Sequence, residues 1–181
     1  MDRTFDPRRL DVKAFAQADG ELQGQMPLVQ WPRLWAEQQA GGQAADHVVR
    51  WRLQGSTVPV TGGPARIGMA LWAQAQLLMQ CQRCLAPVVE TVVAEREFVF
   101  VADEATAEAM DDESEEDVLA ISRDFDALSL IEDELIMALP LVARHDVCPQ
   151  DLPAAAVDEA FEAASERPNP FAALAALKKK G

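Results

Sequence analysis

The sequence predicts an α+β fold: a single domain around an antiparallel β-sheet or a partly open barrel, with flanking helices and an acidic flexible loop. Two long stretches, 67–79 and 88–101, alternate apolar and polar residues as half-buried strands do. Leucine and isoleucine then recur at helical spacing over 128–139. The chain has 181 residues, 49% of them hydrophobic and 25% charged. This length suits one ordinary domain and is too short for two large ones, so we predict a single domain over 1–181.

The first third of the chain is expected to contain two short helices and one strand. Residues 5–15 fit a helix with Asp6 as its N-cap and Pro7 at the first helical position, where the missing N–H of proline is harmless. A strand is expected over 21–28 and a helical turn over 31–39.

The middle of the chain has the pattern of β-strands. Val49, Trp51 and Leu53 alternate with Arg50 and Arg52. One face of this strand would therefore be buried, while the other would present two guanidinium groups.

The two long strands are expected to form an antiparallel hairpin. The strand over 67–79 leads directly into Cys81 and Cys84, and the strand over 88–101, rich in valine and phenylalanine, begins just after Pro87. The two cysteines therefore lie at the predicted tip of the hairpin.

An acidic stretch follows the second long strand. Residues 103–117 contain nine acidic residues and no basic one, with too few apolar side chains to bury, so we predict a solvated, mobile insert. It is either a purely solvating segment or a phosphate mimic that engages a basic protein.

The helix over 128–139 comes next and ends at Pro140. A C-terminal helix segment is predicted over 167–181, with Asn169 as its cap.

The formal net charge of −14 argues against binding to nucleic acid, because phosphates repel carboxylates, but the acidity is regional. Residues 1–102 hold ten Lys and Arg against ten Asp and Glu.

The candidates for contact with RNA are Arg50, Arg52, Arg66, Arg83, Lys178, Lys179 and Lys180. Trp51 or Trp72 would stack on bases if exposed, although tryptophans are more often core residues. The alternative interpretation is a solvated strand face for the arginines, and a favourable interaction with the helix dipole for the lysines.

All three cysteines of the chain enter one candidate metal site. Cys81 and Cys84 form a CxxC pair, and Cys148 follows three positions after His145. Four ligands of these types can close a tetrahedral zinc site, which would leave no open position for water or substrate and would therefore be structural. The alternatives are that the cysteines simply pack a turn and that His145 is a surface residue.

Other roles of the cysteine pair are less favoured. A disulfide between Cys81 and Cys84 is the weaker interpretation, since we expect a reducing cytoplasmic location: the chain shows neither a membrane-spanning run nor a signal peptide. Redox-active CxxC pairs usually open a helix, whereas the flanks here are predicted strands. A nuclease is also disfavoured, because His47 and His145 are far apart in sequence and no glycine-rich phosphate loop is evident.

Three separated blocks resemble one known family. They are Cys81–Pro87 after a strand, Ile131–Pro140 leading to His145 and Cys148, and the ending Arg167–Leu174. In this order and spacing they resemble the YceD family, the large ribosomal RNA subunit accumulation proteins. The resemblance implies a bacterial cytoplasmic protein that supports synthesis, processing or stability of that RNA, without a known catalytic activity. The second pair of candidate ligands is here a histidine and a cysteine in place of another CxxC.

We therefore predict a non-enzymatic ribosome-biogenesis factor for large-subunit (23S) ribosomal RNA, with a possible structural zinc as its one cofactor. Its partner would be that RNA or a ribosome-assembly protein, and no membrane is involved. The alternative is a protein-interaction module with a structural zinc site, which affects ribosomal RNA only indirectly.

Overall fold

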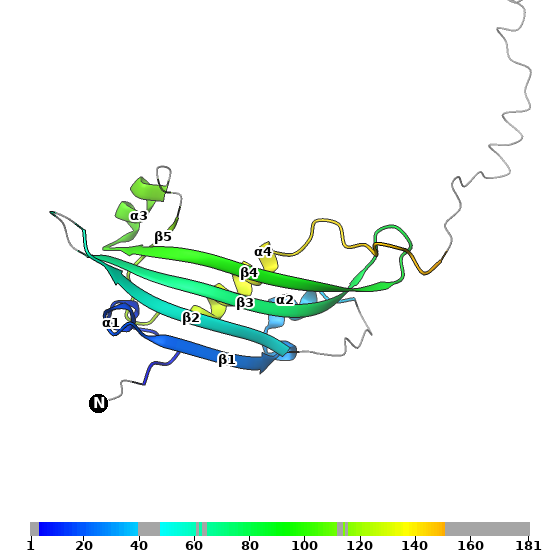
Figure 1. The fold of residues 1–181 in the computed structure, drawn as a ribbon, viewed down its shortest axis with the longest axis horizontal. Coiled ribbons are helices and arrows are strands. Elements are labelled where there is room, and N and C mark those ends of the chain that lie inside the picture. Colours follow the sequence, from blue (N-terminus) through cyan, green and yellow to red (C-terminus); the bar gives the residue numbers. More distant parts are fainter. Residues whose placement is uncertain are drawn as a thin grey trace, which may run out of the picture. The chain divides into compact units, whose positions relative to one another are not determined.

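The structure is a computed structural model that describes residues 4–39, 48–60, 62, 65–111, 114 and 116–150. The chain divides into two compact units, residues 1–147 and 148–181. All described helices and strands belong to the first unit (Figure 1). They are α1 (Val12–Gln17), β1 (Glu21–Pro27), the 3₁₀ turn η1 (Leu28–Gln30), α2 (Pro32–Ala36), β2 (Val48–Val58), β3 (Arg66–Gln80), β4 (Pro87–Val101), α3 (Glu104–Asp111), β5 (Asp117–Ala120) and α4 (Ala127–Met137).

The strands form one open sheet in the order β1-β2-β3-β4-β5. The strands β1 to β4 pair with one another in antiparallel fashion, whereas β5 runs parallel to β4. The α+β class is confirmed. The predicted antiparallel pairing holds for β1 to β4, and β5 makes the sheet a mixed one, because the chain crosses through α3 between β4 and β5 and so returns in the same direction. The described strands do not close into a barrel, since β1 and β5 are the two edges of the sheet.

The long hairpin of β3 and β4 has the predicted form. Residues pair from Ile67 with Phe100 to Gln80 with Pro87, which places the cysteine pair in the connecting turn. Alternate residues of β3, such as Leu71, point into the core. The two-residue period of the sequence therefore sets both the strands and their register.

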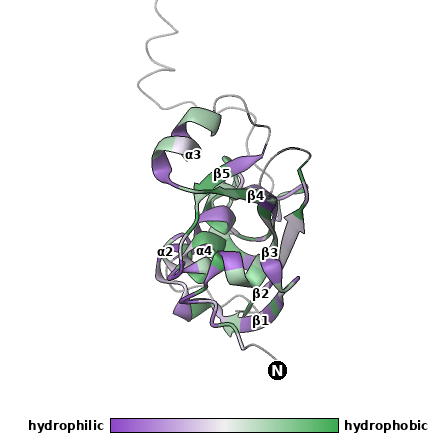
Figure 2. Cartoon of the chain, turned by 90° about the vertical axis from the view of Figure 1, so that its left-hand side faces the viewer, coloured by the Kyte–Doolittle hydropathy of each residue, from purple (hydrophilic) through white to green (hydrophobic). Residues whose placement is uncertain are grey.

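The helices cover one face of the sheet. Buried residues of α1, α2 and α4, among them Phe15, Leu34 and Ile131, join Leu53 and Leu71 of the strands in one hydrophobic cluster. Figure 2 shows α2 and α4 on one side of the strands. Within the described residues, no helix of this cluster packs on the opposite face, which we call the outer face.

The first helix begins later than predicted. Asp11 is its N-cap, since its carboxylate accepts the N–H of Ala14 at 3.0 Å, whereas Asp6 only stabilises a preceding turn through the N–H of Arg8 at 2.9 Å. The cause is a tertiary contact. Leu10 exchanges two backbone hydrogen bonds with Phe125, at 2.8 and 3.0 Å, which keeps residue 10 extended and delays the helix.

Part of the predicted acidic loop is helical. Residues Glu104–Asp111 form α3, and Asp103 accepts hydrogen bonds from the backbone and the hydroxyl of Thr106 at 2.8 and 2.7 Å. Ala107 is buried, although most of this helix is exposed. The loop prediction is therefore wrong for these residues, because a local cap and one small apolar contact suffice to order a short helix. The mobility of the insert over 103–117 stays a prediction.

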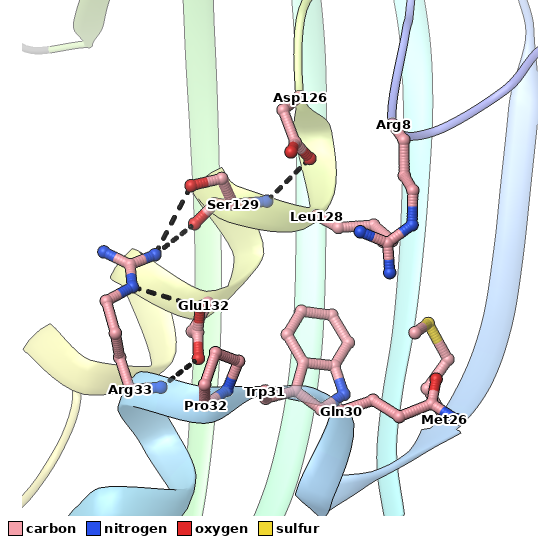
Figure 3. A pocket seen from close by; sticks show the side chains of 10 residues that line it. All are labelled: Arg8, Met26, Gln30, Trp31, Pro32, Arg33, Asp126, Leu128, Ser129 and Glu132. Atoms are coloured by element: carbon pink, nitrogen blue, oxygen red, sulfur yellow. Dashed lines mark hydrogen bonds and ion pairs between the residues drawn. The ribbon is translucent and has the colours of Figure 1, made fainter.

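Two glutamates of α4, Glu132 and Glu134, are buried, and Figure 3 shows Glu132 with its contacts to Arg33. Glu132 accepts the backbone N–H groups of Arg33 and Leu34 at 2.8 and 3.1 Å, and the Arg33 Nε at 3.1 Å. It thereby caps α2, whose own N-cap, Trp31, has no side-chain acceptor. Glu134 accepts from the Arg96 Nε at 3.1 Å. Both carboxylates thus join elements of the fold.

Among the described helices, none combines the length and the apolar character that crossing a bilayer requires. The predicted C-terminal helix over 167–181 and Lys178, Lys179 and Lys180 lie outside the described residues. The single domain over 1–181 likewise stays a prediction.

Candidate metal centre

The turn between β3 and β4 folds around its first cysteine. The Cys81 N–H donates to the Ala86 carbonyl and the Leu85 N–H donates to the Cys81 carbonyl, both at 2.9 Å. Leu85 takes a left-handed conformation with φ of 62°, which lets the chain turn back into β4. This backbone geometry holds the Cys81 and Cys84 side chains on the same turn.

Cys81 is fully buried and its environment favours the thiolate. Burial acts to raise the pKa of Cys81, but hydrogen bonds from the backbone of Cys84, His145 and Arg83 and from the Cys84 side chain outweigh it. The result is a pKa of about 5. A thiolate surrounded by backbone N–H donors is the form of cysteine that binds metal.

The segment after α4 is held against the hairpin tip. Ala143 is buried and its carbonyl accepts the Gln82 N–H at 2.8 Å, while the Arg144 N–H donates to the Glu90 carboxylate at 3.2 Å. These bonds place His145 directly over the turn.

The ring of His145 is oriented by both of its nitrogens. Nε2 lies 3.0 Å from the Pro87 carbonyl oxygen and Nδ1 lies 3.5 Å from the Cys84 Sγ. Because a carbonyl can only accept, Nε2 carries the proton and Nδ1 presents a lone pair towards the sulfurs. A histidine that donates its second N–H to a backbone carbonyl is the usual arrangement of a metal ligand.

The four predicted residues come together. The ligand atoms of Cys81, Cys84, His145 and Cys148 all lie within 4.8 Å of one another. Ligands about 2.3 Å from a tetrahedral zinc would be separated by about 3.8 Å, so a small contraction of the group would accommodate the ion. Cys81 is buried and the other three are half-buried. Chemically, this group can hold a metal ion with three sulfurs and one nitrogen.

The arginine candidates are spread along the sheet rather than gathered. Arg50 and Arg52 are exposed on β2, and the Arg52 Nε pairs with Glu21 at 3.1 Å. Arg66, at the start of β3, pairs with the Glu116 carboxylate. Arg83 lies exposed in the hairpin turn, at the other end of β3.

The two candidate tryptophans differ in exposure. Trp51 is 6% exposed and belongs to the core, whereas Trp72 is 38% exposed on the outer face. The core assignment is therefore right for Trp51 and wrong for Trp72, whose strand position points away from the helices.

Some groups of the centre escaped prediction. The Pro87 carbonyl and the backbone N–H groups around Cys81 carry no signal in a sequence. Every residue has a backbone carbonyl, and every residue except proline has a backbone N–H. The left-handed Leu85 is also unexpected, because leucine seldom adopts this conformation.

Comparison with known proteins decides the family. The profile of the family described as "Large ribosomal RNA subunit accumulation protein YceD" matches residues 69–178, which is more than half of the chain. The chain belongs to the YceD family. The matched span starts in β3 and includes all four residues of the candidate metal centre.

One curated relative carries the same name as the family. The chain is 34% identical over 106 residues to the "Large ribosomal RNA subunit accumulation protein YceD" of Haemophilus influenzae. The match covers 56% of this chain and 60% of that protein. No solved structure matches this YceD-family chain.

Proposed function

We propose that this protein is a non-enzymatic ribosome-biogenesis factor that supports synthesis, processing or stability of large-subunit (23S) ribosomal RNA in the cytoplasm. The observation that carries the proposal is membership of the YceD family, together with the role for which the Haemophilus influenzae relative is named. The fold is compatible, since the buried carboxylates of α4 cap and cross-link structural elements.

Deletion of the gene tests this proposal. We expect mature 23S RNA to fall relative to 16S RNA, or its precursors to accumulate, and a plasmid copy of the wild-type gene to restore the ratio. Unchanged levels of both mature and precursor RNA in the deletion strain would remove the proposal. Purified protein is expected to leave RNA intact in the presence of divalent metal, and cleavage would contradict the non-enzymatic role.

We further propose that the four-residue centre holds one structural zinc ion. Three sulfurs and one imidazole form a donor set that favours zinc over magnesium or calcium, which prefer oxygen. The hydrogen bond from His145 to Pro87 supports the same assignment. Four protein ligands leave no open position, so the ion would stabilise the hairpin tip and would not take part in catalysis.

Metal analysis under reducing conditions tests the zinc proposal. We expect about one zinc per chain in the wild type, and a loss of most of it in Cys81→Ser and Cys84→Ser variants. Gln82→Ala is the matched control, since it lies in the same turn and is not one of the four candidate ligands. Equal metal content in all four proteins would exclude a specific site.

A second candidate function is favoured by one observation. Large apolar side chains are exposed around the centre: Leu85 is 64% exposed, Leu141 102%, Val142 58% and Val147 85%. Such a group of apolar residues is typical of a surface that binds another protein. In that case the protein would bind a ribosome-assembly protein and affect RNA indirectly. The salt dependence of binding distinguishes the two candidate functions, because direct binding to RNA weakens steeply with ionic strength and apolar docking to a protein does not.

A further inference from the structure

One row of residues crosses four strands on the outer face of the sheet. Gln23 of β1 pairs with Arg52 of β2, Arg52 pairs with Trp72 of β3, and Trp72 pairs with Glu95 of β4. Directly paired residues have their side chains on the same face, so these four lie side by side. The row sets an indole between a guanidinium group and a carboxylate.

The neighbouring row has the same polar character. Gln25, Arg50 and Gln74 are paired across β1, β2 and β3. The two arginines are therefore two residues apart on β2, on the same face as the indole. Trp72 is 38% exposed, whereas the core tryptophans Trp31 and Trp51 are 2% and 6% exposed.

Six residues of these two rows line an open depression of about 680 Å³. Its lining includes Gln23, Gln25, Arg50, Arg52, Trp72 and Glu95. The helices of the hydrophobic cluster pack on the other face, so no helix of that cluster covers the depression in the part of the chain that the structure describes.

We propose that this depression binds unpaired nucleotides of RNA, with the Trp72 indole as the stacking platform. Stacking of bases on exposed aromatic side chains is the main way in which proteins hold single-stranded RNA. The guanidinium groups of Arg50 and Arg52 lie where they complement the flanking phosphates. This inference rests on the proposed role with ribosomal RNA, and it adds the surface of the protein that binds and the unpaired form of the RNA that is bound.

Glu95 gives the site a preference among bases. A carboxylate repels phosphate but accepts hydrogen bonds from the exocyclic amino groups of adenine, cytosine and guanine. Next to Trp72, it is placed to read the edge of a stacked base, and the Gln23 and Gln25 amides can do the same. Uracil lacks an amino group and should bind less well.

The ion pair between Arg52 and Glu21 does not block the site. Its side chains are 52% and 48% exposed, and pairs in solvent contribute little stability, so Arg52 can exchange this partner for a phosphate. A protein ligand is less well matched, because of the two tryptophans that line the depression only Trp72 is substantially exposed, whereas protein interfaces usually have a continuous apolar core.

Fluorescence anisotropy with labelled 12-nucleotide RNAs tests the site. We expect the full-length protein to bind oligo(C) or oligo(A) more tightly than oligo(U), and to bind a duplex of the same length weakly. Trp72→Leu should weaken binding at least fivefold and Trp72→Phe should retain most of it, as stacking requires. Trp35→Leu is the matched control, because Trp35 is 41% exposed and lies on α2, away from the outer face.

Two more variants separate the parts of the site. The Arg50→Gln, Arg52→Gln double variant should bind less tightly and with a shallower dependence on salt. Glu95→Gln should weaken discrimination between oligo(C) and oligo(U). Circular dichroism of each variant confirms its fold.

The results distinguish this inference from the proposed function. Equal RNA binding by Trp72→Leu and Trp35→Leu, or duplex binding as tight as single-strand binding, would show that Trp72 is not a stacking platform for unpaired bases. The inference is also wrong if the wild type binds none of the RNAs, or if Trp72→Leu loses binding to a protein partner and keeps its binding to RNA. A normal RNA profile in the deletion strain would instead remove the proposed function itself.

Discussion

At the scale of single residues, the candidate metal centre depends on how backbone groups orient side chains. The Pro87 carbonyl selects which nitrogen of His145 carries the proton, and backbone N–H groups lower the pKa of Cys81 to about 5. Both effects come from backbone groups of the chain itself. The protein thereby orients the His145 ring and favours the Cys81 thiolate in this donor set.

The left-handed Leu85 supplies one test at this scale. Its φ of 62° is unfavourable for leucine but not for glycine, and its side chain is 64% exposed and loses little contact. We expect Leu85→Gly to raise the free energy of unfolding by about 0.5 kcal/mol, because relief of strain exceeds the entropy cost of glycine. Leu85→Ala keeps the strain and should not be stabilising. Urea denaturation measures both, and a loss of stability in the glycine variant would contradict the strained turn.

Glu134 supplies a second test through pH. Burial raises the pKa of Glu134, and its ion pair with Arg96 opposes the shift. The folded state therefore holds the proton more tightly than the unfolded state, so this contribution to stability is present at low pH and is lost as the pH rises through the folded pKa.

Arg96→Met removes the opposing charge and should raise the pKa of Glu134 further. The fall in stability should then extend to higher pH than in the wild type. Urea denaturation at a series of pH values checks this, and a wild-type profile in the variant would show that Arg96 does not act on Glu134.

At the scale of secondary-structure elements, long periodic segments were predictable and short or long-range features were not. The β3 and β4 hairpin follows from alternation over 67–79 and 88–101. The strand β5 has four residues and follows an acidic stretch, so its period is too brief to detect. Glu132 is buried because of Arg33, about a hundred residues away in the chain, and no local pattern shows such a partner.

The cap that Glu132 provides to α2 predicts a large effect on stability. Glu132→Ala leaves two N–H groups and the Arg33 side chain without this acceptor, and we expect a loss of roughly 2–3 kcal/mol in the free energy of unfolding. Asp133→Ala is the control, because this neighbour is only half-buried and its pair with Arg33 lies near solvent, where about 0.5 kcal/mol is expected. Similar losses in both variants would reject the capping role.

Removal of the metal should act on one element first. If zinc joins the 143–148 segment to the hairpin turn, a chelator should increase amide exchange of Gln82, which donates to Ala143, at least tenfold. Leu71, in the middle of β3, should keep its protection, because the core does not depend on the ion. Equal changes at both amides would indicate global unfolding and would contradict a local role.

At the scale of the whole molecule, the described chain has two surfaces with different chemistry. One end of the β3 and β4 hairpin carries the candidate metal centre with exposed apolar side chains, and the outer face carries Trp72 and two arginines. The net charge of −14 would discourage RNA binding by the molecule as a whole, so the RNA binding that we propose would have to be local. Recognition of unpaired bases by stacking satisfies this condition, because it depends less on net charge.

The most direct measurement is X-ray absorption at the zinc edge of the purified, reduced protein. Convergence of Cys81, Cys84, His145 and Cys148 on one ion predicts three sulfur neighbours at about 2.3 Å and one nitrogen at about 2.0 Å. His145→Ala should lose the nitrogen and keep the sulfurs. A zinc bound only by oxygen and nitrogen, or protein free of zinc with a disulfide between Cys81 and Cys84, would contradict the metal centre.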